Sequence, residues 1–313
     1  MQKEGTALVF PGQGSQFVGM GAGFYAEKST KELFEQADDT LHFHLTKLML
    51  EGDASELTST ENTQPALLLC GIAAATYLQK QTGKPIEALC RFVAGHSLGE
   101  YTALCAAGSF DFETALQLVR KRGQAMQSAV TEGEGGMLAL LGLPSDVVKE
   151  IADAAKCYVA NDNSEGQVVL SGSLNTLETA QELASARGVK RAVMLDVSSP
   201  FHSPFMQSAA EVMAAELDAH KPQQSNVSVV MNIPAQVVDS AEQIKQNLVD
   251  QVVGSVRWRE SMVYMAEREI TQIYELGCGK VLTGLAKRCD RRLKGQALTS
   301  PKEIDEMLQA VNA

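Results

Sequence analysis

A serine between two glycines is the first candidate for chemistry in this chain. Residues 95–99 read Gly-His-Ser-Leu-Gly, a G-x-S-x-G string that is typical of a nucleophile elbow. The apolar run 92–95 precedes Ser97 and a helical segment, 100–107, follows it, which is the strand-turn-helix setting of that motif. There the N–H of Leu98, at the start of the helix, would point toward a developing oxyanion. The alternative is a serine N-cap on an ordinary turn between a strand and a helix.

A serine nucleophile needs a base, and the chain has 5 histidines. His202 is the favoured candidate because it lies in 199–205, an apolar turn bounded by prolines that would hold the imidazole in one orientation. The alternative for His202 is a buried histidine with a structural hydrogen bond. The remaining four lack such a setting: His42, His44, His96 and His220.

Glycines also surround Gln13, directly after the first apolar run. The string is not a dinucleotide-binding G-x-G-x-x-G, because Phe17 stands at its sixth position. A tight turn at this point would expose backbone N–H groups. We therefore expect the N–H of Gln13 to be a second donor to an oxyanion.

Arg122 carries information about a substrate. It lies in the predicted helix 111–129, where at about 100° per residue it falls between Leu118 and Met126, near the edge of the apolar stripe. A guanidinium turned toward the core needs an anion, and its fork fits a carboxylate. An internal salt bridge or a side chain that reaches the solvent are the alternatives.

The elements that would position these residues form an α/β pattern. Short apolar runs bounded by glycine or proline predict buried strands, and a capped apolar segment after Asn62 predicts a buried helix. Strands that alternate with helices favour a mainly parallel sheet covered by helices. The strands are expected at 7–10, 92–95, 227–231 and 270–276, and the buried helix at 63–80.

The stretch 136–197 has the order strand, helix, strand, strand, helix, strand. That order is the split βαβ pattern of a ferredoxin-like domain. Glycine-rich 131–136 precedes it and Ser198-Ser199-Pro200 follows it, and both are natural hinges. We therefore predict a ferredoxin-like subdomain, 131–198, inserted into a catalytic core made of 1–130 and 199–313.

The composition excludes several classes of function. Lys+Arg 27 against Asp+Glu 38 gives a net charge of −11, so nucleic acid is not an expected partner. The longest apolar run, 66–75, is about half a membrane span, and the N-terminus has no apolar signal core. The 6 cysteines form no CxxC pair, which argues against a disulfide framework and a zinc site. We expect a cytoplasmic protein with reduced thiols, no metal and no membrane association.

With these residues assembled, the chain resembles the bacterial malonyl-CoA:acyl carrier protein transacylases of type II fatty acid synthesis. The likeness covers Leu8 to about Arg288 and rests on several ordered motifs rather than on one. They are FPGQGSQ at 10–16, QPALLL at 64–69, GHSLGEYTAL at 95–104, RG at 122–123, GQVVLSG at 166–172, PFHSPFM at 200–206, VRW at 256–258 and KVLTGL at 280–285. One departure is Cys278, where the family usually has proline between the two glycines.

The resemblance implies an α/β-hydrolase-like core with an inserted ferredoxin-like subdomain. It also implies Ser97 as nucleophile, His202 as base, and the main-chain carbonyl of Gln251 as the group that orients the imidazole. Gln13 and Leu98 would supply the oxyanion-hole N–H groups, and Arg122 would bind the malonyl carboxylate. Leu98 after the serine and Phe201 before the histidine resemble the malonyl-selective pattern.

The implied reaction is a ping-pong transfer of the malonyl group from malonyl-CoA to acyl carrier protein through an acyl-serine. The CoA thioester and the phosphopantetheine arm are substrates, no cofactor is needed, and we expect a monomer. A serine esterase or thioesterase and a catalytically silent carrier-protein-binding subunit are the alternatives. Since the carrier protein and this chain are both acidic, docking needs a local basic patch. The candidates are Lys190, Arg191, Lys287 and Arg288, for which the alternative is a solvated basic surface.

Overall fold

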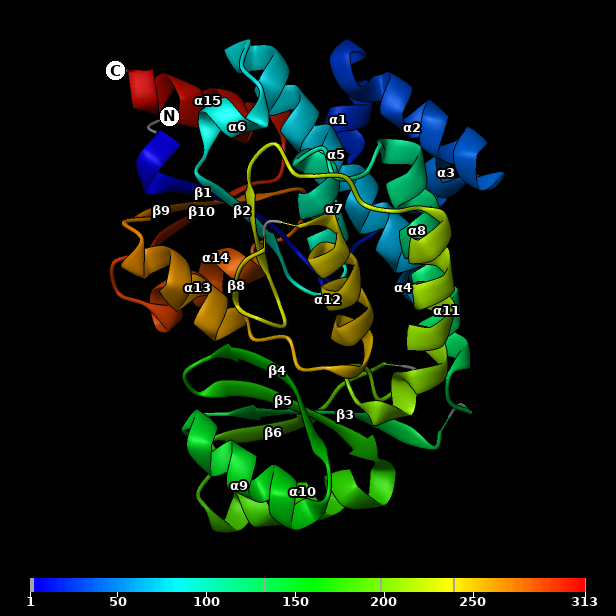
Figure 1. Ribbon diagram of the computed structural model, residues 1–313, viewed down its shortest axis with the longest axis vertical. Helices are drawn as coiled ribbons and strands as arrows, with labels where there is room; N and C mark the ends of the chain where they lie inside the picture. Colours follow the sequence, from blue (N-terminus) through cyan, green and yellow to red (C-terminus); the bar gives the residue numbers. More distant parts are fainter. Residues whose placement is uncertain (1–2, 132, 198, 239, 313) are drawn as a thin grey trace.

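The computed structural model describes residues 3–131, 133–197, 199–238 and 240–312, which form two sheets covered by helices (Figure 1). The larger sheet has the strand order β10-β9-β1-β2-β7-β8. All of its neighbours are parallel except β7 and β8. The predicted mainly parallel sheet is therefore confirmed. Its strands are β1 (Thr6–Phe10), β2 (Phe92–Gly95), β7 (Ser228–Met231), β8 (Gln236–Val237), β9 (Gln272–Leu276) and β10 (Lys294–Leu298).

Alternation along β1 explains the layers around this sheet. Leu8 and Phe10 belong to one apolar cluster, and Ala7 and Val9 belong to another on the opposite face. The first cluster holds α5 and its neighbours, and the second holds α13 and α14. The N-terminal part of the chain begins with a 3₁₀ turn, η1 (Lys3–Gly5). Its helices are α1 (Ala22–Ala26), α2 (Lys28–Leu41), α3 (Leu45–Glu51), α4 (Ala54–Thr58), α5 (Thr60–Thr82), α6 (Ile86–Leu89), α7 (Gly99–Ala106) and α8 (Phe112–Ser128).

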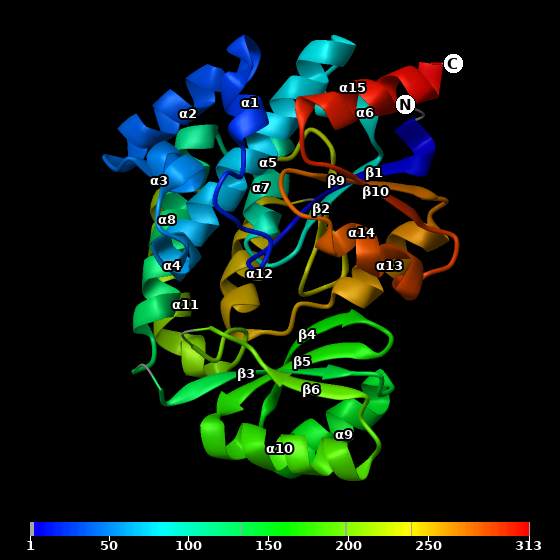
Figure 2. The ribbon, with the colours of Figure 1, turned by 180° about the vertical axis from the view of Figure 1, so that it is seen from behind.

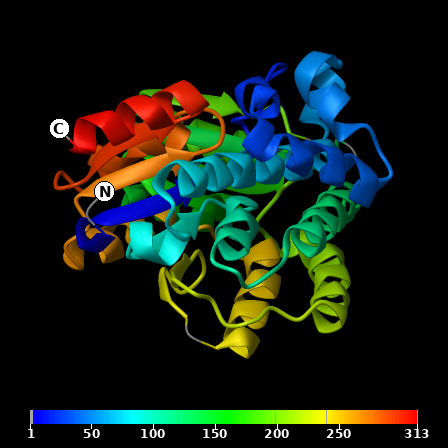
Figure 3. The ribbon, with the colours of Figure 1, turned by 90° about the horizontal axis from the view of Figure 1, so that it is seen from above.

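The C-terminal part adds further helices to the same core. They are η2 (Pro204–Met206), α11 (Gln207–Ala219), α12 (Ala241–Val253), α13 (Trp258–Glu267), α14 (Val281–Cys289) and α15 (Pro301–Asn312). Seen from above, α15 lies on the same side of the molecule as the start of β1 (Figure 3). No helix among the described residues is long and apolar enough to cross a membrane.

The start of α5 differs from the sequence-based expectation. The helix begins at Thr60 rather than after Asn62. Asn62 does not cap it, because its side chain lies within the first turn and donates to the carbonyl of Glu56. The predicted start was wrong because the Asn62 side chain bonds a carbonyl of the preceding helix, α4, instead of a backbone N–H at the start of α5.

The smaller sheet has the order β4-β5-β3-β6, with antiparallel neighbours throughout. Numbered within this unit it reads 2-3-1-4, with one helix after its first strand and one after its third, so the predicted ferredoxin-like pattern is present. Its elements are β3 (Gly135–Leu141), α9 (Ser145–Ala155), β4 (Tyr158–Ser164), β5 (Gln167–Ser173), α10 (Leu174–Ala186) and β6 (Arg191–Met194). The boundaries 131–198 stay a prediction, and Glu132 and Ser198 of the two expected hinges lie outside the described residues.

The two sheets face each other across the site. Helices α9 and α10 pack on one face of the smaller sheet, while Ala139, Ala160 and Val169 on its other face join the large core cluster. Helices α13 and α14 lie between the large sheet and β4 (Figure 2). The carboxyl ends of β1 and β2 are therefore directed at the smaller sheet, which is where a site is expected in a parallel α/β sheet.

Candidate active site

Ser97 lies at a strained turn between β2 and α7. Its φ angle is 52°, a left-handed conformation that a residue other than glycine adopts at a cost of about 1–3 kcal/mol. A Cβ at Gly95 would lie 1.8 Å from the carbonyl oxygen of Gly99, and one at Gly99 would lie 2.3 Å from that of Phe10. Only glycine fits at either position, which explains the G-x-S-x-G string physically. The N-cap reading of the serine does not hold, because Leu98 occupies the N-cap position of α7.

His202 lies directly against the serine. Its Nε2 is 2.7 Å from Ser97 Oγ, and its Nδ1 is 2.8 Å from the main-chain oxygen of Gln251, near the end of α12. A carbonyl accepts only, so Nδ1 carries the proton and Nε2 is free to accept one from the serine. The expected rigid turn is present: Ser171 Oγ donates to the carbonyl of Phe201, and Ser203 Oγ to that of Pro200.

Burial lowers the pKa of His202 to about 3, and the positive charge of Arg122 adds to that effect. The imidazole is therefore uncharged at pH values near 7, and it can accept a proton without first losing one. A substrate carboxylate on Arg122 would offset the guanidinium charge and raise the pKa of His202, which would make it a stronger base when the site is filled.

This pKa shift predicts the pH dependence of serine reactivity. Protonated His202 cannot accept the Ser97 proton, so reactivity falls only as the pH drops through the lowered pKa. We expect labelling of Ser97 by phenylmethylsulfonyl fluoride, a neutral reagent with no carboxylate to titrate, to lose less than half of its rate between pH 7 and pH 5.5. A fall centred near the ordinary histidine value of about 6.5 would contradict the prediction.

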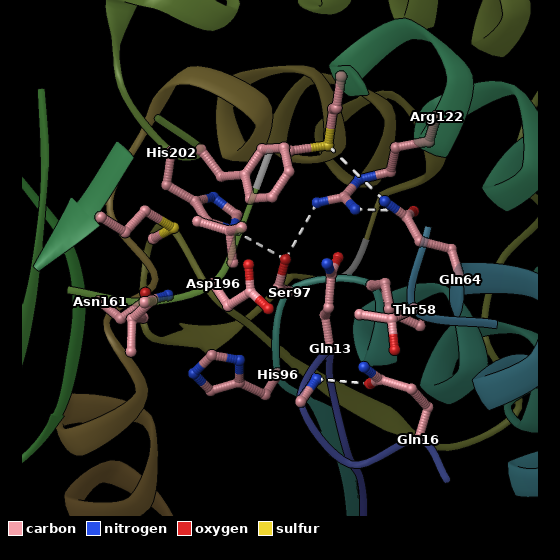
Figure 4. A pocket seen from close by; sticks show the side chains of 17 residues that line it. Gln13, Gln16, Thr58, Gln64, His96, Ser97, Arg122, Asn161, Asp196 and His202 are labelled. Carbon is pink, nitrogen blue, oxygen red and sulfur yellow. Dashed lines mark hydrogen bonds between the residues drawn. The ribbon is translucent and has the colours of Figure 1, made fainter. Parts of the chain in front are cut away.

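Arg122 of α8 is fully buried and has no acid in ion-pair contact. Its side chain is 1% exposed, and none of the ion pairs among the described residues includes it. Instead, Nη1 donates to Gln64 Oε1 at 2.9 Å, and Nη2 donates to Ser97 Oγ at 3.1 Å (Figure 4). Nη2 also donates to Gln251 Oε1 at 2.8 Å. Of the two alternatives, the internal salt bridge and the solvent-reaching side chain, the structure shows neither.

The candidate oxyanion donors, Gln13 and Leu98, lie in the same cavity as Ser97. Phe10 pairs with Gly95 in the register of β1 and β2, so the turn that carries Gln13 and the turn that carries Ser97 leave the sheet side by side. Within the part of the chain that the structure describes, neither the Gln13 nor the Leu98 backbone N–H is taken by another acceptor. Both are thus available to an oxygen in the cavity.

These groups line one cavity of about 260 Å³ between the two sheets. It brings together Ser97, His202, Arg122, Phe201, Gln13 and Leu98, and Gln251 lies behind His202. Five more lining residues come from the smaller sheet and the chain after β6: Met137, Asn161, Leu195, Asp196 and Val197. Figure 4 shows Ser97 between His202 and Arg122, with Gln13 on a neighbouring loop.

Sequence reasoning missed several residues of the site. His96 lines the cavity, although its ring points to the smaller sheet, where Nε2 lies 2.7 Å from Asn163 Oδ1. Burial lowers the pKa of His96. Asn232 follows β7 and accepts the N–H of Ser97 at 2.8 Å through Oδ1. Its place just after a parallel strand was a signal that could have revealed it.

The cysteines and the other possible metal ligands form no second site among the described residues. All six cysteines are free thiols. The described residues contain no group of three or more His, Cys, Asp or Glu side chains that could hold a metal ion.

The family model of the acyl transferase domain matches residues 7–286. The malonyl CoA-acyl carrier protein transacylase of Bacillus subtilis (strain 168) is 43% identical over 97% of this chain and 96% of its own length. This chain belongs to the malonyl CoA-acyl carrier protein transacylase family. The resemblance inferred from the motifs and the predicted fold class, an α/β-hydrolase-like core with a small subdomain, are both confirmed.

Solved structures of the transacylase family match the chain over its full extent. The acyl-carrier-protein-S-malonyltransferase of Bartonella henselae superposes with a TM-score of 0.95 at 42% identity, over 99% of this chain and 100% of that one. A malonyl-transacylase in complex with its type II PKS acyl-carrier protein superposes with a TM-score of 0.92 at 38% identity, over 97% of this chain and 99% of that one.

Proposed function

We propose that the protein transfers a malonyl group from malonyl-CoA to the phosphopantetheine thiol of acyl carrier protein, in fatty acid synthesis. The main support for malonyl as the transferred group comes from Arg122. A buried guanidinium without an ion-pair partner lies 3.1 Å from the nucleophile oxygen. An acyl group bonded to Ser97 Oγ can place a carboxylate on that guanidinium only if the carboxylate follows the thioester carbon closely, as it does in malonate.

In the proposed acylation step, His202 Nε2 takes the proton of Ser97 as Oγ attacks the thioester carbon. The N–H groups of Gln13 and Leu98 donate to the tetrahedral oxyanion. The carbon–sulfur bond then breaks, and His202 returns the proton to the leaving CoA thiolate. The carbonyl of Gln251 keeps the imidazole in the tautomer that both proton transfers require.

In the second step the carrier-protein thiol takes the place of CoA and gives its proton to His202. The thiolate attacks the acyl-serine, and the proton returns to Ser97 Oγ as the ester bond breaks. No atom outside the two substrates and these side chains enters the balance, so the proposal needs no metal or redox cofactor. Because all of these residues come from one chain, we propose a monomer as the active unit.

We also propose the predicted basic patch as the docking surface for the acidic carrier protein. All four of its side chains are exposed, and none forms an ion pair with the described residues: Lys190, Arg191, Lys287 and Arg288. Arg288 Nη1 donates to Gln167 Oε1 at 3.2 Å. Gln167 pairs with Leu141, and Leu141 with Arg191, across β5, β3 and β6. This row supports one continuous patch that joins α14 to the smaller sheet.

Charge reversal of these four residues to glutamate tests the patch. We expect the KM for carrier protein to rise about tenfold and to lose its salt dependence, because attraction across a rim of charges acts on the encounter. Acylation by malonyl-CoA should stay nearly unchanged. Lys80, in the last turn of α5, and Lys84, just after that helix, make the control pair for reversal. An unaltered KM and salt dependence in the fourfold variant would remove the patch from the proposal while leaving the chemistry in place.

The transfer itself is tested by mass spectrometry on the wild-type protein. With malonyl-CoA alone we expect a stable protein adduct of malonyl mass, and after addition of carrier protein that mass should move to the carrier. Steady loss of the adduct to water would instead indicate the esterase or thioesterase. No adduct at all would indicate a catalytically silent subunit.

A further inference from the structure

Among the described residues, the only carboxyl group in the hydrogen-bond network behind Ser97 and His202 is Glu100, in the first turn of α7. It is completely buried at 0% exposure, although the proposed mechanism does not use it. Its Oε1 accepts the backbone N–H of Asn232 at 2.5 Å, and its Oε2 accepts a hydrogen bond from Gln251 Nε2. Burial raises the pKa of Glu100, and these two N–H donors and the charge of Arg122 oppose that rise. Since burying a carboxyl group costs free energy, its presence here points to a role in this network.

Gln251 connects this carboxyl to the carboxylate-binding residue. Its side-chain Nε2 faces acceptors only: the Glu100 carboxyl, which makes the shortest contact, the carbonyl of Ser97 at 3.0 Å and Asn232 Oδ1 at 3.4 Å. Its Oε1 faces a donor, Arg122 Nη2, at 2.8 Å. Because an amide has one donor end and one acceptor end, the carboxyl at one end fixes which end meets the guanidinium.

On this basis we propose that Glu100 is a positioning residue for acyl-group selectivity. It holds the Gln251 amide so that its oxygen faces Arg122, and this keeps Nη2 of the guanidinium 3.1 Å from Ser97 Oγ. His202 is held by the main-chain oxygen of the same Gln251, not by its side chain. The influence of Glu100 on Arg122 can therefore be separated from the orientation of His202. This inference rests on the function proposed above.

The glutamine in Glu100→Gln has nearly the same shape as the native side chain. Unlike the two carboxyl oxygens, however, its oxygen and NH₂ group cannot both accept a hydrogen bond. If its oxygen meets Asn232, its NH₂ group meets the NH₂ group of Gln251. If Gln251 then turns over, its own NH₂ group meets Arg122 and its oxygen meets the carbonyl of Ser97. Each arrangement leaves two like groups in contact inside a buried network, and the one in which Gln251 turns over places an NH₂ group against Arg122, which displaces the guanidinium.

The expected result is a change in selectivity. In Glu100→Gln the rate of Ser97 acylation by malonyl-CoA should fall about 100-fold, the order that a displaced positioning group costs. Acylation by acetyl-CoA, which has no carboxylate, should change less than about threefold, so the ratio of the two rates falls. A merely structural role would lower both rates alike and leave their ratio unchanged.

A control and a second variant complete the experiment. Thr102→Val lies on the same helix, where the Thr102 hydroxyl is buried and has no hydrogen-bond partner among the described residues, so its ratio should equal that of the wild type. Gln251→Met keeps the main-chain oxygen but removes the amide, and it should reproduce the loss of selectivity even if Glu100→Gln does not fold.

The outcomes separate the two proposals. Wild-type protein that malonyl-CoA does not acylate would contradict the proposed function itself. Wild-type protein that is acylated, together with a wild-type malonyl to acetyl ratio in either Glu100→Gln or Gln251→Met, would overturn the role of Glu100 alone. A lowered ratio in both variants, with Thr102→Val unchanged, supports it.

Discussion

Replacing His202 with alanine should lower the rate of Ser97 acylation by a factor on the order of 10³. General-base catalysis contributes about 10²–10⁴-fold, and within the described part of the chain the imidazole is the only base in contact with Ser97 Oγ. Its Nε2 lies 2.7 Å from Oγ, whereas the other contact, Arg122 Nη2, is a donor. Single-turnover acylation by malonyl-CoA, followed by quenched-flow mass spectrometry, measures the effect.

His220→Ala is the matched control, because among the residues that the structure describes the His220 side chain is bonded only to the carbonyl of Glu216 in the preceding turn of α11, and it lies outside the cavity. It should acylate at the wild-type rate. If His202→Ala lost less than about tenfold, another group would have to accept the serine proton.

Replacing Arg122 with alanine should reverse the selectivity between acyl groups. The guanidinium is desolvated and charged, and loss of one partner from a buried charge pair costs about 3–5 kcal/mol. That corresponds to a loss on the order of 10²–10⁴-fold for malonyl-CoA. Acetyl-CoA makes no use of the charge, so its rate should change little. Competition between the two thioesters in one reaction gives the ratio directly.

A structural role for Arg122 would produce a different result. Its side chain also bonds Gln64, so its loss could loosen α8 against α5. Gln64→Leu removes that bond while keeping the guanidinium and serves as the control. Equal losses for both thioesters in Arg122→Ala would assign the residue to stability rather than to carboxylate binding.

The sequence was most informative where the backbone needs a particular residue type. Gly95 and Gly99 could be assigned to a sharp turn from the string alone, because no other residue fits against the carbonyls of Gly99 and Phe10. Helical periodicity likewise predicted that Arg122 turns toward the core, where it is 1% exposed. Strand and helix order was sufficient to predict the ferredoxin-like unit.

Sequence reasoning failed where a contact depends on packing between distant segments. Asn232 supports the turn of Ser97 from a position 135 residues away, and its place just after a strand does not show which group it meets. Glu100 stood inside a recognised motif, yet its burial and its two partners appear only once β7 and α12 are packed against α7. Local patterns cannot show which polar group a buried carboxyl will meet.

The central claim is that Ser97 carries the acyl group between the two thioesters. Peptide-level mass spectrometry of wild-type protein after malonyl-CoA, before and after a chase with carrier protein, tests it most directly. We predict malonyl mass on the peptide that contains Ser97, its complete transfer to the carrier thiol in the chase, and no adduct in Ser97→Ala. A malonyl adduct on any other residue, or one on Ser97 that the carrier protein does not remove, would contradict the account.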